Sequence, residues 1–493
     1  MKALKVALIF TVVAISAAFY CLPHARSRSA GPNAIVSPLL RAGPAARPAN
    51  VAGTSYGLFN CQVGLDPTSV CYDPYQVRHA YDIDPLIHAG FDGKGKTIVI
   101  VDAFQSPNIV QELNTYNAFY GLPSLNGLGS PNNSHLGLFT QVAPDGLTAF
   151  DPTNADMSGW AQEISLDVQW SHAIAPGANI VLVLAKSDAD ADIFSATKYA
   201  VNHHLGDVIS QSFGENESCM DPGLLAQQHQ LFAQATLESI TLIASAGDFG
   251  SGQPTCDGSA LTLAASTPAS DPLVTSVGGT ELHAAPYCLT ALSCNPATHP
   301  APGTYQSERV WNEPAFGAGG GGFSVIYGQP FYQLAAVRGS KQRGVPDVTY
   351  SAAVLHGLLT YLNIPGIPAG FYLFGGTSAG SPQWAAITAI ADEKAGHALG
   401  FINWSLYFAG LIPPEYSQAF NDVTSGNNAF AGVPGFKAGP GWDAASGLGS
   451  PSAEQLVNFV ILVTTPLDGF SAVLASQPHS NGFLFPPGHM KPH

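Results

Sequence analysis

Apolar runs of strand length alternate with helical stretches over residues 97–245. The strand-like runs cover 97–101, 179–184, 207–213 and 241–245, and the helical stretches cover 107–120, 158–174 and 224–237. A run that is apolar throughout belongs to a strand covered on both faces, and strands that alternate with helices form parallel sheets. The sequence therefore predicts an α/β fold with a doubly wound, mainly parallel sheet and helices on both of its faces.

The composition excludes several classes of protein. Of the 493 residues, 46% are apolar and only 11% are charged, so the chain has the apolar content of a large folded core and not that of a disordered chain. Its 18 Lys and Arg residues against 34 Asp and Glu residues give a net charge of −16, which argues against a nucleic-acid partner. We expect the folded protein to be a monomer.

The two ends of the chain differ in composition from its middle. Lys2 and Lys5 precede the apolar run 6–20, a pattern shared by a secretory signal peptide and an uncleaved N-terminal anchor. We assign residues to four segments: 1–29 signal or anchor, 30–55 flexible linker, 56–465 folded domain, and 466–493 C-terminal tail. With the signal removed, we expect the protein to be secreted and to have no stable association with a membrane.

The cysteines indicate disulfides. Six of the seven remain when Cys21 of the signal segment is set aside, and an even number in an exported chain is typical of a disulfide framework. Because the six fall into three near pairs along the chain, we predict the bridges Cys61–Cys71, Cys219–Cys256 and Cys288–Cys294. Neither a C-x-x-C motif nor neighbouring histidines indicate that these cysteines bind a metal instead.

The stretch Gly375-Gly-Thr-Ser-Ala-Gly-Ser-Pro382 is the most informative motif. Its glycines predict a tight turn from a strand into a helix, with Ser378 at the helix N-terminus, where free amides and the helix dipole stabilise negative charge. Pro382 suits the first turn of that helix. An ordinary glycine-rich turn with a capping serine explains these residues equally well. The pattern Gly-Thr-Ser-x-x-x-Pro is, however, similar to the nucleophile signature of the subtilisin clan.

Three carboxylates are candidates for the proton transfers that such a serine needs. The clan normally uses a histidine in a His-Gly-Thr-His-like motif, which this chain lacks. Glu163 and Asp167 are four residues apart in the predicted helix 158–174, so they project from one face; such a pair shares protons and functions in acid. Asp248, after the strand 241–245, would donate a hydrogen bond to an oxyanion when protonated. A solvated acidic stripe and a turn aspartate are the alternative interpretations.

In their order along the chain, these motifs resemble the sedolisin family of serine-carboxyl peptidases over residues 72–463. The resemblance rests on the following segments: Cys71-Tyr-Asp-Pro-Tyr-Gln-Val-Arg-His-Ala-Tyr81, the Glu163/Asp167 helix, Ala246-Gly-Asp248, Gly319-Gly-Gly-Gly-Phe-Ser324, Arg343-Gly-Val-Pro-Asp347 and Gly376-Thr-Ser378. It implies a subtilisin-like fold and an acid-active serine-carboxyl endopeptidase that cleaves protein or peptide substrates through an acyl-enzyme. It also implies these roles: Ser378 nucleophile, Glu163 general base, Asp167 partner of Glu163, Asp248 oxyanion donor.

The resemblance further implies one bound Ca²⁺ in a C-terminal loop region. Residues 421–426 and 439–443 resemble the family's calcium site. The matching ligands are the side chains of Asp422 and Asp443 and the backbone carbonyls of Val423, Gly439 and Gly441. Calcium prefers such a mixture of carboxylate and carbonyl oxygens.

Some features depart from the family pattern. Only about fifty residues precede the predicted domain, whereas family members usually carry a large inhibitory N-terminal prosegment. Two alternatives to an endopeptidase are a catalytically silent binding protein of the same fold and a tripeptidyl peptidase. The presence of all four predicted catalytic residues argues against the silent relative, but the sequence does not distinguish the two kinds of peptidase. We leave Asp102, at the end of the first strand, outside the predicted site because strand-end turns favour aspartate.

Overall fold

An eight-stranded, mostly parallel sheet forms the centre of the protein. The computed structural model describes residues 36–49, 57–129, 133, 136–288 and 300–464. The strand order is β14-β13-β9-β7-β4-β6-β5, with β19 also paired to β13, and among the pairs only β13–β14 is antiparallel. The strands of this sheet are β4 (Thr97–Ala103), β5 (Phe139–Val142), β6 (Asn179–Ala185), β7 (Val208–Gln211), β9 (Thr241–Ser245), β13 (Thr275–Ala284), β14 (Tyr305–Val310) and β19 (Val348–Ser351). This confirms the predicted α/β fold.

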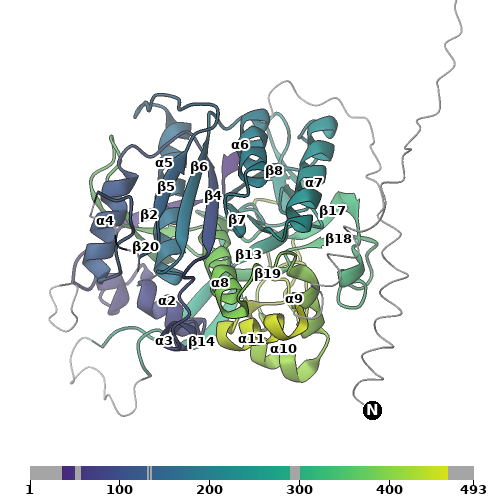
Figure 1. The fold of residues 1–493 in the computed structure, drawn as a ribbon. Helices are drawn as coiled ribbons and strands as arrows, with labels where there is room; N and C mark the ends of the chain where they lie inside the picture. Colours follow the sequence, from purple (N-terminus) through teal and green to yellow (C-terminus); the bar gives the residue numbers. More distant parts are fainter. Residues whose placement is uncertain (1–35, 50–56, 130–132, 134–135, 289–299, 465–493) are drawn as a thin grey trace, which may run out of the picture.

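Ten α-helices lie in the described part of the chain. They are α2 (Pro74–Ala80), α3 (Asp84–His88), α4 (Ile109–Tyr120), α5 (Ala155–Ile174), α6 (Asp190–Asn202), α7 (Pro222–Leu237), α8 (Ser381–Ala395), α9 (Asn403–Gly410), α10 (Pro413–Ala419) and α11 (Ala453–Thr464). Three single turns of 3₁₀-helix accompany them: η1 (Asn60–Gln62), η2 (Phe331–Gln333) and η3 (Thr377–Ala379). The helices α9, α10 and α11 gather at the lower end of the molecule in Figure 1.

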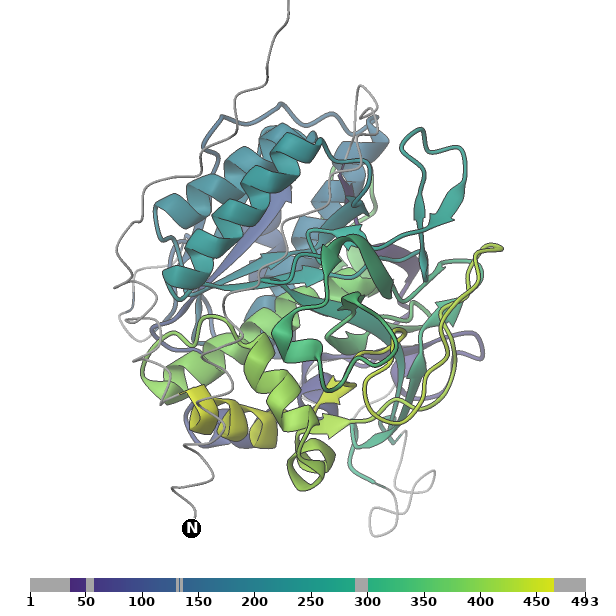
Figure 2. The same cartoon turned by 90° about the vertical axis from the view of Figure 1, so that its right-hand side faces the viewer.

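Side chains of the first strand alternate between the two faces of the sheet. Ile98 and Ile100 of β4 belong to the core formed with α4, α5 and α8, whereas Val99 and Val101 belong to the core formed with α6 and α7. Figures 1 and 2 show α6 and α7 together on one side of the sheet. Because side chains of a strand point alternately to opposite faces, a strand that is apolar at every position needs helices on both sides.

Shorter strands form the remaining sheets. One four-stranded sheet has the order β2-β21-β20-β3, and a three-stranded sheet has the order β1-β8-β12. Their strands are β1 (Ser37–Pro38), β2 (Arg41–Ala45), β3 (Val70–Tyr72), β8 (Phe213–Asn216), β12 (Ser266–Thr267), β20 (His356–Leu362) and β21 (Gly370–Gly375). The two-stranded sheets pair β10 (Gly252–Pro254) with β11 (Leu261–Leu263), β15 (Asn312–Glu313) with β16 (Gly317–Ala318), β17 (Gly322–Gly328) with β18 (Gln342–Val345), and β22 (Phe420–Asn421) with β23 (Ser450–Pro451).

The prediction that residues 30–55 form a flexible linker is wrong for residues 36–49. The strand β1 pairs with β8, and β2 pairs with β21, the strand that leads to Ser378. These pairings satisfy the backbone donors and acceptors of the segment, which composition alone does not reveal. Residues 30–35 and 50–55 lie outside the described residues, as do the segments 1–29 and 466–493.

Two of the three predicted disulfides are confirmed: Cys61–Cys71 and Cys219–Cys256. Cys288 is disulfide-bonded, and its predicted partner Cys294 lies outside the described residues. Among the described helices, none combines the length and apolar character needed to cross a membrane.

Candidate active site

The carboxyl ends of the middle strands bring polar residues to one edge of the sheet. Along the strand order, β4 lies between β6 and β7, and the chain leaves β4 first towards one side of the sheet and later returns to the other. Such a switch in strand order leaves a crevice at the carboxyl ends of open α/β sheets. Asp102 lies near the end of β4, Ser212 follows β7, and Asp248 follows β9.

Ser378 lies in the turn between β21 and α8, as the sequence predicts. Gly376 has a φ of +91°, which glycine adopts without strain. A Cβ at Gly376 would overlap the Leu39 carbonyl oxygen and would lie 2.7 Å from Asp248 Oδ2, so only glycine fits here. The Ser378 side chain is fully buried in the turn η3, directly before α8.

Glu163 and Asp167 lie on α5, and both are fully buried. Ser378 Oγ donates a hydrogen bond to Glu163 Oε2 at 2.9 Å. Burial raises the pKa of Glu163 well above its usual range, and the nearby Asp167 and Asp102 raise it further, while the Ser378 bond opposes them. Burial also raises the pKa of Asp167. The alternative interpretation of a solvated acidic stripe is therefore wrong.

Asp102 belongs to the same cluster of carboxyl groups, and sequence reasoning missed it. It is fully buried at the end of β4, and burial followed by the charge of Asp167 raises its pKa well above the usual value. Within the described part of the chain, neither of its carboxyl oxygens has a hydrogen-bond partner. The signal that could have found it is its position at the carboxyl end of a central strand, the edge where such sheets hold their ligands.

Asp248 faces the Ser378 turn from the loop after β9. Its Oδ1 accepts hydrogen bonds from Thr377 N at 2.7 Å and from Thr377 Oγ1 at 2.9 Å. Its Oδ2 lies 3.5 Å from Arg41 Nε and would lie 2.7 Å from a Cβ at Gly376. Burial raises the pKa of Asp248, although Arg41 and the Thr377 bonds oppose that shift. Asp248 is thus an internal carboxyl group that reaches the site, and the simple turn-residue interpretation is wrong.

His172 and His356 have partners other than Ser378. His172 is fully buried, its Nε2 lies 2.8 Å from the Pro123 carbonyl, and burial lowers its pKa to about 4. His356 Nδ1 lies 3.0 Å from the Leu282 carbonyl. Among the described residues no histidine forms a hydrogen bond with Ser378 or Glu163, so the titratable side chain beside the serine is the carboxyl group of Glu163.

The N-terminal segment 36–46 crosses this site as an extended chain. Val36 N donates to the Asp188 carbonyl at 3.0 Å, and β1 pairs antiparallel with β8. Leu39 N donates to the Ser212 carbonyl at 3.1 Å, and Ser378 N donates to the Leu39 carbonyl at 3.0 Å. The sequence gives no periodic signal for this placement, because the contacts are made by the backbone.

The segment continues past Ser378 on the other side. The strand β2 pairs with β21, with Arg41 opposite Gly375, and the Arg41 guanidinium lies 4.9 Å from the centre of the Phe249 ring. The Leu39 and Val36 side chains are buried. The peptide bond between Leu39 and Leu40 therefore lies beside Ser378, and the chain is held by the pairing of β1 with β8 before it and by the pairing of β2 with β21 after it.

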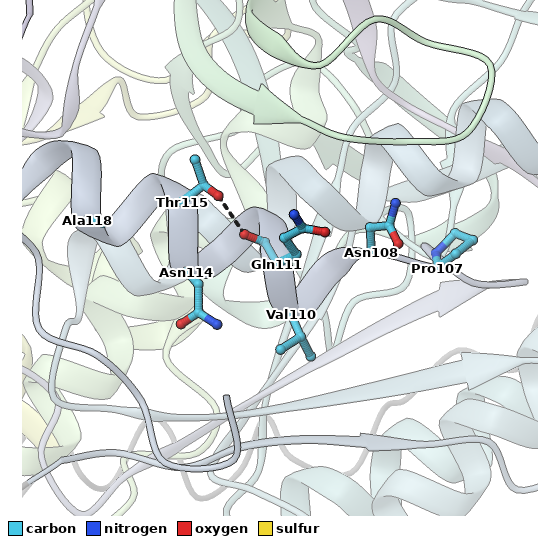
Figure 3. A pocket seen from close by; sticks show the side chains of 7 residues that line it. All are labelled: Pro107, Asn108, Val110, Gln111, Asn114, Thr115 and Ala118. Atoms are coloured by element: carbon cyan, nitrogen blue, oxygen red, sulfur yellow. Dashed lines mark hydrogen bonds between the residues drawn. The ribbon is translucent and has the colours of Figure 1, made fainter. Parts of the chain in front are cut away.

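A surface hollow of about 550 Å³ lies elsewhere, along α4. Figure 3 shows its lining: Pro107, Asn108, Val110, Gln111, Asn114, Thr115 and Ala118. Apart from Pro107 and Asn108 just before the helix, the lining residues belong to α4 itself. Because the hollow contains none of the carboxyl groups and not Ser378, it is not the place of the chemistry described above.

The five predicted calcium ligands lie together in the C-terminal loops. Gly441 N donates to Asp422 Oδ2 at 3.0 Å, and Gly439 N donates to Asp443 Oδ2 at 2.9 Å. Ser446 Oγ lies within hydrogen-bond distance of both the Val423 carbonyl oxygen and Asp443 Oδ1. In the described part of the chain no Lys, Arg or His forms an ion pair with either aspartate. Two uncompensated carboxylates with neighbouring carbonyls fit a hard cation.

Comparisons with known proteins agree with the fold and the site described above. No family model matches the chain. Kumamolisin from Bacillus sp. (strain MN-32) is 31% identical over 401 residues, which are 79% of this chain and 64% of that protein. Sedolisin from Pseudomonas sp. (strain 101) is 32% identical over 353 residues, which are 68% of this chain and 54% of that protein. Tripeptidyl peptidases also match, including tripeptidyl-peptidase 1 of Rattus norvegicus at 28% identity over 329 residues.

The solved structure of Pseudomonas sedolisin, a serine-carboxyl proteinase complexed with two molecules of pseudo-iodotyrostatin, superposes with a TM-score of 0.64 at 27% identity. The match covers 80% of this chain and 98% of that one. The fold and the site define a subtilisin-like α/β protein with a carboxylate, instead of an imidazole, beside its serine. The chain belongs to the sedolisin family. It spans less than two thirds of the length of kumamolisin and of sedolisin.

Proposed function

We propose that the protein is an acid-active serine-carboxyl endopeptidase. The observation that carries the proposal is the 2.9 Å hydrogen bond from Ser378 Oγ to the buried carboxylate oxygen Glu163 Oε2. A serine is a weak nucleophile by itself, and a positioned base within hydrogen-bond distance activates it. The extended segment 36–46 across the same serine supports a polypeptide substrate.

The first half of the reaction forms an acyl-enzyme. Glu163 accepts the Ser378 hydroxyl proton while Ser378 Oγ attacks the carbonyl carbon of the substrate peptide bond. The carbonyl oxygen then carries negative charge at the position that the Leu39 carbonyl now occupies, where Ser378 N donates a hydrogen bond. Glu163 gives the proton to the leaving amine nitrogen, and the peptide bond breaks.

Asp248 is the second donor to the oxyanion. Its Oδ1 is held by Thr377, and its free Oδ2 borders Gly376, as the Leu39 carbonyl oxygen does. Burial raises the pKa of Asp248, so this carboxyl group keeps its proton in acid and donates it in a hydrogen bond. In the second half, water attacks the acyl carbon and gives a proton to Glu163. Glu163 passes this proton to Ser378 Oγ as the bond between Oγ and the acyl carbon breaks, which releases the carboxylic acid product and restores the Ser378 hydroxyl.

The buried carboxyl groups make this chemistry depend on pH. The reaction needs Asp248 protonated and Glu163 ionised, so the cluster must lose a proton from Glu163 while Asp248 keeps its own. Asp167 and Asp102 lie near enough to raise the pKa of Glu163, and the three groups share protons instead of ionising together. An imidazole base, with an ordinary pKa of about 6.5, would be protonated in acid and could not accept the Ser378 proton there.

Endopeptidase action is favoured over tripeptidyl-peptidase action by the segment in the site. If the Leu39 carbonyl occupies the reacting position, the chain has Leu39, Pro38 and Ser37 before the reacting bond and Val36 as a fourth residue. Val36 N is bonded to the Asp188 carbonyl, so the fourth position is held by the protein. A tripeptidyl peptidase instead accepts a substrate whose N-terminus lies three residues before the bond that is cleaved.

We further propose that the protein is secreted and holds one calcium ion. The N-terminal pattern of two lysines before an apolar run supports export. Asp422 and Asp443, with the carbonyls of Val423, Gly439 and Gly441, would hold the ion. The ion would neutralise the two carboxylates and fix the C-terminal loops, with no part in the proton transfers.

Cleavage of peptides with free and acetylated N-termini tests the proposal. The purified chain is incubated with both forms of one long peptide across pH 3 to 7, and the cleaved bonds are identified by mass spectrometry, with the Ser378→Ala chain as control. We expect internal cleavage of both peptides in acid and none by Ser378→Ala. Release of tripeptides from the free form alone would identify a tripeptidyl peptidase. Absence of cleavage at every pH would contradict a peptidase.

A further inference from the structure

Three metal-ligating side chains meet at a point where two sheets come together. Glu281 and His283 lie two residues apart on β13 of the central sheet, and His356 is the first residue of β20 in the four-stranded sheet. The ligand atoms of the three side chains all lie within 4.8 Å of one another. The two histidines are 73 positions apart in the sequence, so no local motif brings attention to them.

The distances within the cluster suit a small tetrahedral ion. His283 Nε2 lies 3.0 Å from Glu281 Oε1, and His356 Nε2 lies 3.7 Å from the same oxygen. The centres of the two imidazole rings are 4.5 Å apart. Ligand atoms at about 2 Å from a tetrahedral zinc ion are separated from one another by roughly 3.3 Å, which lies between these two distances.

A backbone carbonyl orients the imidazole of His356. Its Nδ1 lies 3.0 Å from the Leu282 carbonyl, which only accepts hydrogen bonds, so Nδ1 carries the proton. In the neutral ring Nε2 then has a free lone pair, and this nitrogen lies 3.7 Å from Glu281 Oε1. In the usual arrangement of a histidine ligand, one ring nitrogen binds the metal and the other donates its N–H to a group such as a backbone carbonyl.

Arg309 is the competing partner of Glu281. Its Nη2 lies 2.8 Å from both carboxylate oxygens, and its side chain is 57% exposed. One guanidinium nitrogen does not use all the lone pairs of a carboxylate, which has about four acceptor positions. Arg309 therefore leaves room for an ion on Oε1 but weakens its binding by repulsion.

We propose that Glu281, His283 and His356 bind a divalent transition-metal ion of the zinc type. Two imidazoles and one carboxylate form a donor set that Zn²⁺ accepts, whereas Ca²⁺ and Mg²⁺ prefer oxygen ligands. The His283 side chain is 37% exposed and that of His356 is 20% exposed, so water reaches the fourth position. The ion joins the end of β13 to the start of β20, and this site rests on neither the proposed peptidase activity nor the calcium loops.

Titration with ZnCl₂ tests the site without any measurement of activity. The Ser378→Ala chain, without an affinity tag, is titrated calorimetrically at pH 7.5 in the presence of excess CaCl₂, which keeps the calcium loops occupied. We expect His283→Gln and His356→Gln each to lower the zinc affinity by at least ~10-fold, and the double variant to lose one equivalent of zinc. His229→Gln is the matched control, because His229 pairs with Asp271 outside the cluster, and it should bind as the parent does.

Arg309→Gln gives an effect in the opposite direction. It removes the competing positive charge and should raise the zinc affinity. If a histidine variant fails to fold, Co²⁺ added to the parent chain is the second measurement: it should give the visible absorption of a four- or five-coordinate site, and one equivalent of Zn²⁺ should abolish it. Equal zinc stoichiometry and affinity in the parent and the folded double variant would overturn the proposal, as would a parent chain that binds neither ion.

Discussion

At the scale of single residues, burial decides what the carboxyl groups around Ser378 can do. Four of them are fully buried, and for each of the four burial is the largest cause of a raised pKa: Asp102, Glu163, Asp167 and Asp248. The same residue types on an exposed helix face would be solvated, and they would be ionised at any pH well above about 4. Removed from water, they keep their protons to a higher pH, so they can donate and exchange protons where exposed carboxylates could not.

Substitution of Asp248 separates hydrogen-bond donation from negative charge. Asp248→Ala should lower kcat by about 10²–10³-fold, the usual cost of losing an oxyanion donor. Asp248→Asn retains N–H donors and should lose less. Because burial raises the pKa of Asp248, the parent should lose activity as the pH rises through that pKa, whereas Asp248→Asn has no proton to lose there.

The pH profiles of kcat for the parent and for both variants provide the measurement. A shallower alkaline limb in Asp248→Asn than in the parent would support donation by the protonated carboxyl group. Equal losses in the two variants, with unchanged limbs, would contradict that role.

Part of this site could be predicted from sequence. The spacing of Glu163 and Asp167 places them on one helix face, and the glycines before Ser378 identify the turn. Asp102 was missed because an aspartate at a strand end has an ordinary explanation. Its role depends on which strands lie side by side in the sheet, and sequence periodicity carries no such information.

At the scale of secondary-structure elements, the helices and strands of the central layer were predictable. The predicted strand 241–245 coincides with β9, and the predicted helix 158–174 lies within α5. The predicted strand 207–213 is divided into β7 and β8 around Ser212, whose carbonyl accepts a hydrogen bond from Leu39 N. The same carbonyl oxygen lies 3.1 Å from Ser378 Oγ, so it competes with Glu163 for the single hydroxyl proton of the serine. The strands β1 and β2 were not predicted, because only pairing with distant strands orders them.

The segment formed by β1 and β2 gives a prediction about the chain itself. If the proposed function is right, the bond between Leu39 and Leu40 lies where substrates react, so the chain should cleave itself there when acidified. Intact mass and N-terminal analysis should find a new terminus at Leu40. The Ser378→Ala chain, treated in the same way, should remain intact. The same cleavage in both chains, or cleavage of the active chain only at other bonds, would contradict this placement.

At the scale of the whole molecule, buried carboxyl groups make stability depend on pH. Burial raises the pKa of Glu112 to about 7, and it also raises the pKa values of Glu217, Glu308 and Asp392. The folded state then binds protons more tightly than the unfolded chain, so stability is greatest where these groups are protonated and decreases as the pH rises through their folded pKa values. For Glu112 alone, the shift from 4.5 to about 7 corresponds to roughly 3 kcal/mol.

We therefore expect a higher Tm at pH 5.5 than at pH 8, by several degrees. Burial lowers the pKa of His172 to about 4, which acts in the opposite direction as the pH falls below 6.5, but this is one group against several carboxyls. Scanning calorimetry of the Ser378→Ala chain measures the difference without self-cleavage. Glu112→Gln should reduce it, and Asp257→Asn, at an exposed turn, should not. An equal or higher Tm at pH 8 would contradict the expectation.

Calcium should contribute to the stability of the whole molecule. An ion bound by the folded state alone stabilises it by mass action, by about 4 kcal/mol at a thousandfold excess over Kd. Removal of calcium with a chelator should therefore lower the Tm, and Asp443→Ala should abolish that response. If metal-free and calcium-loaded protein melt at the same temperature, the C-terminal loops do not hold the ion.

The central claim is that a carboxylate, and not a histidine, takes the proton of Ser378. The most direct test is the rate of peptide cleavage in acid by Glu163→Gln, which keeps the size and polarity of Glu163 but cannot accept that proton. We predict a loss of at least ~10²-fold in kcat/KM, with a Glu163→Gln/Ser378→Ala double variant little worse than Ser378→Ala, because the two residues act as a unit. His172→Ala and His356→Ala should remain active. A Glu163→Gln enzyme that still cleaves, beside an inactive but folded histidine variant, would contradict the claim.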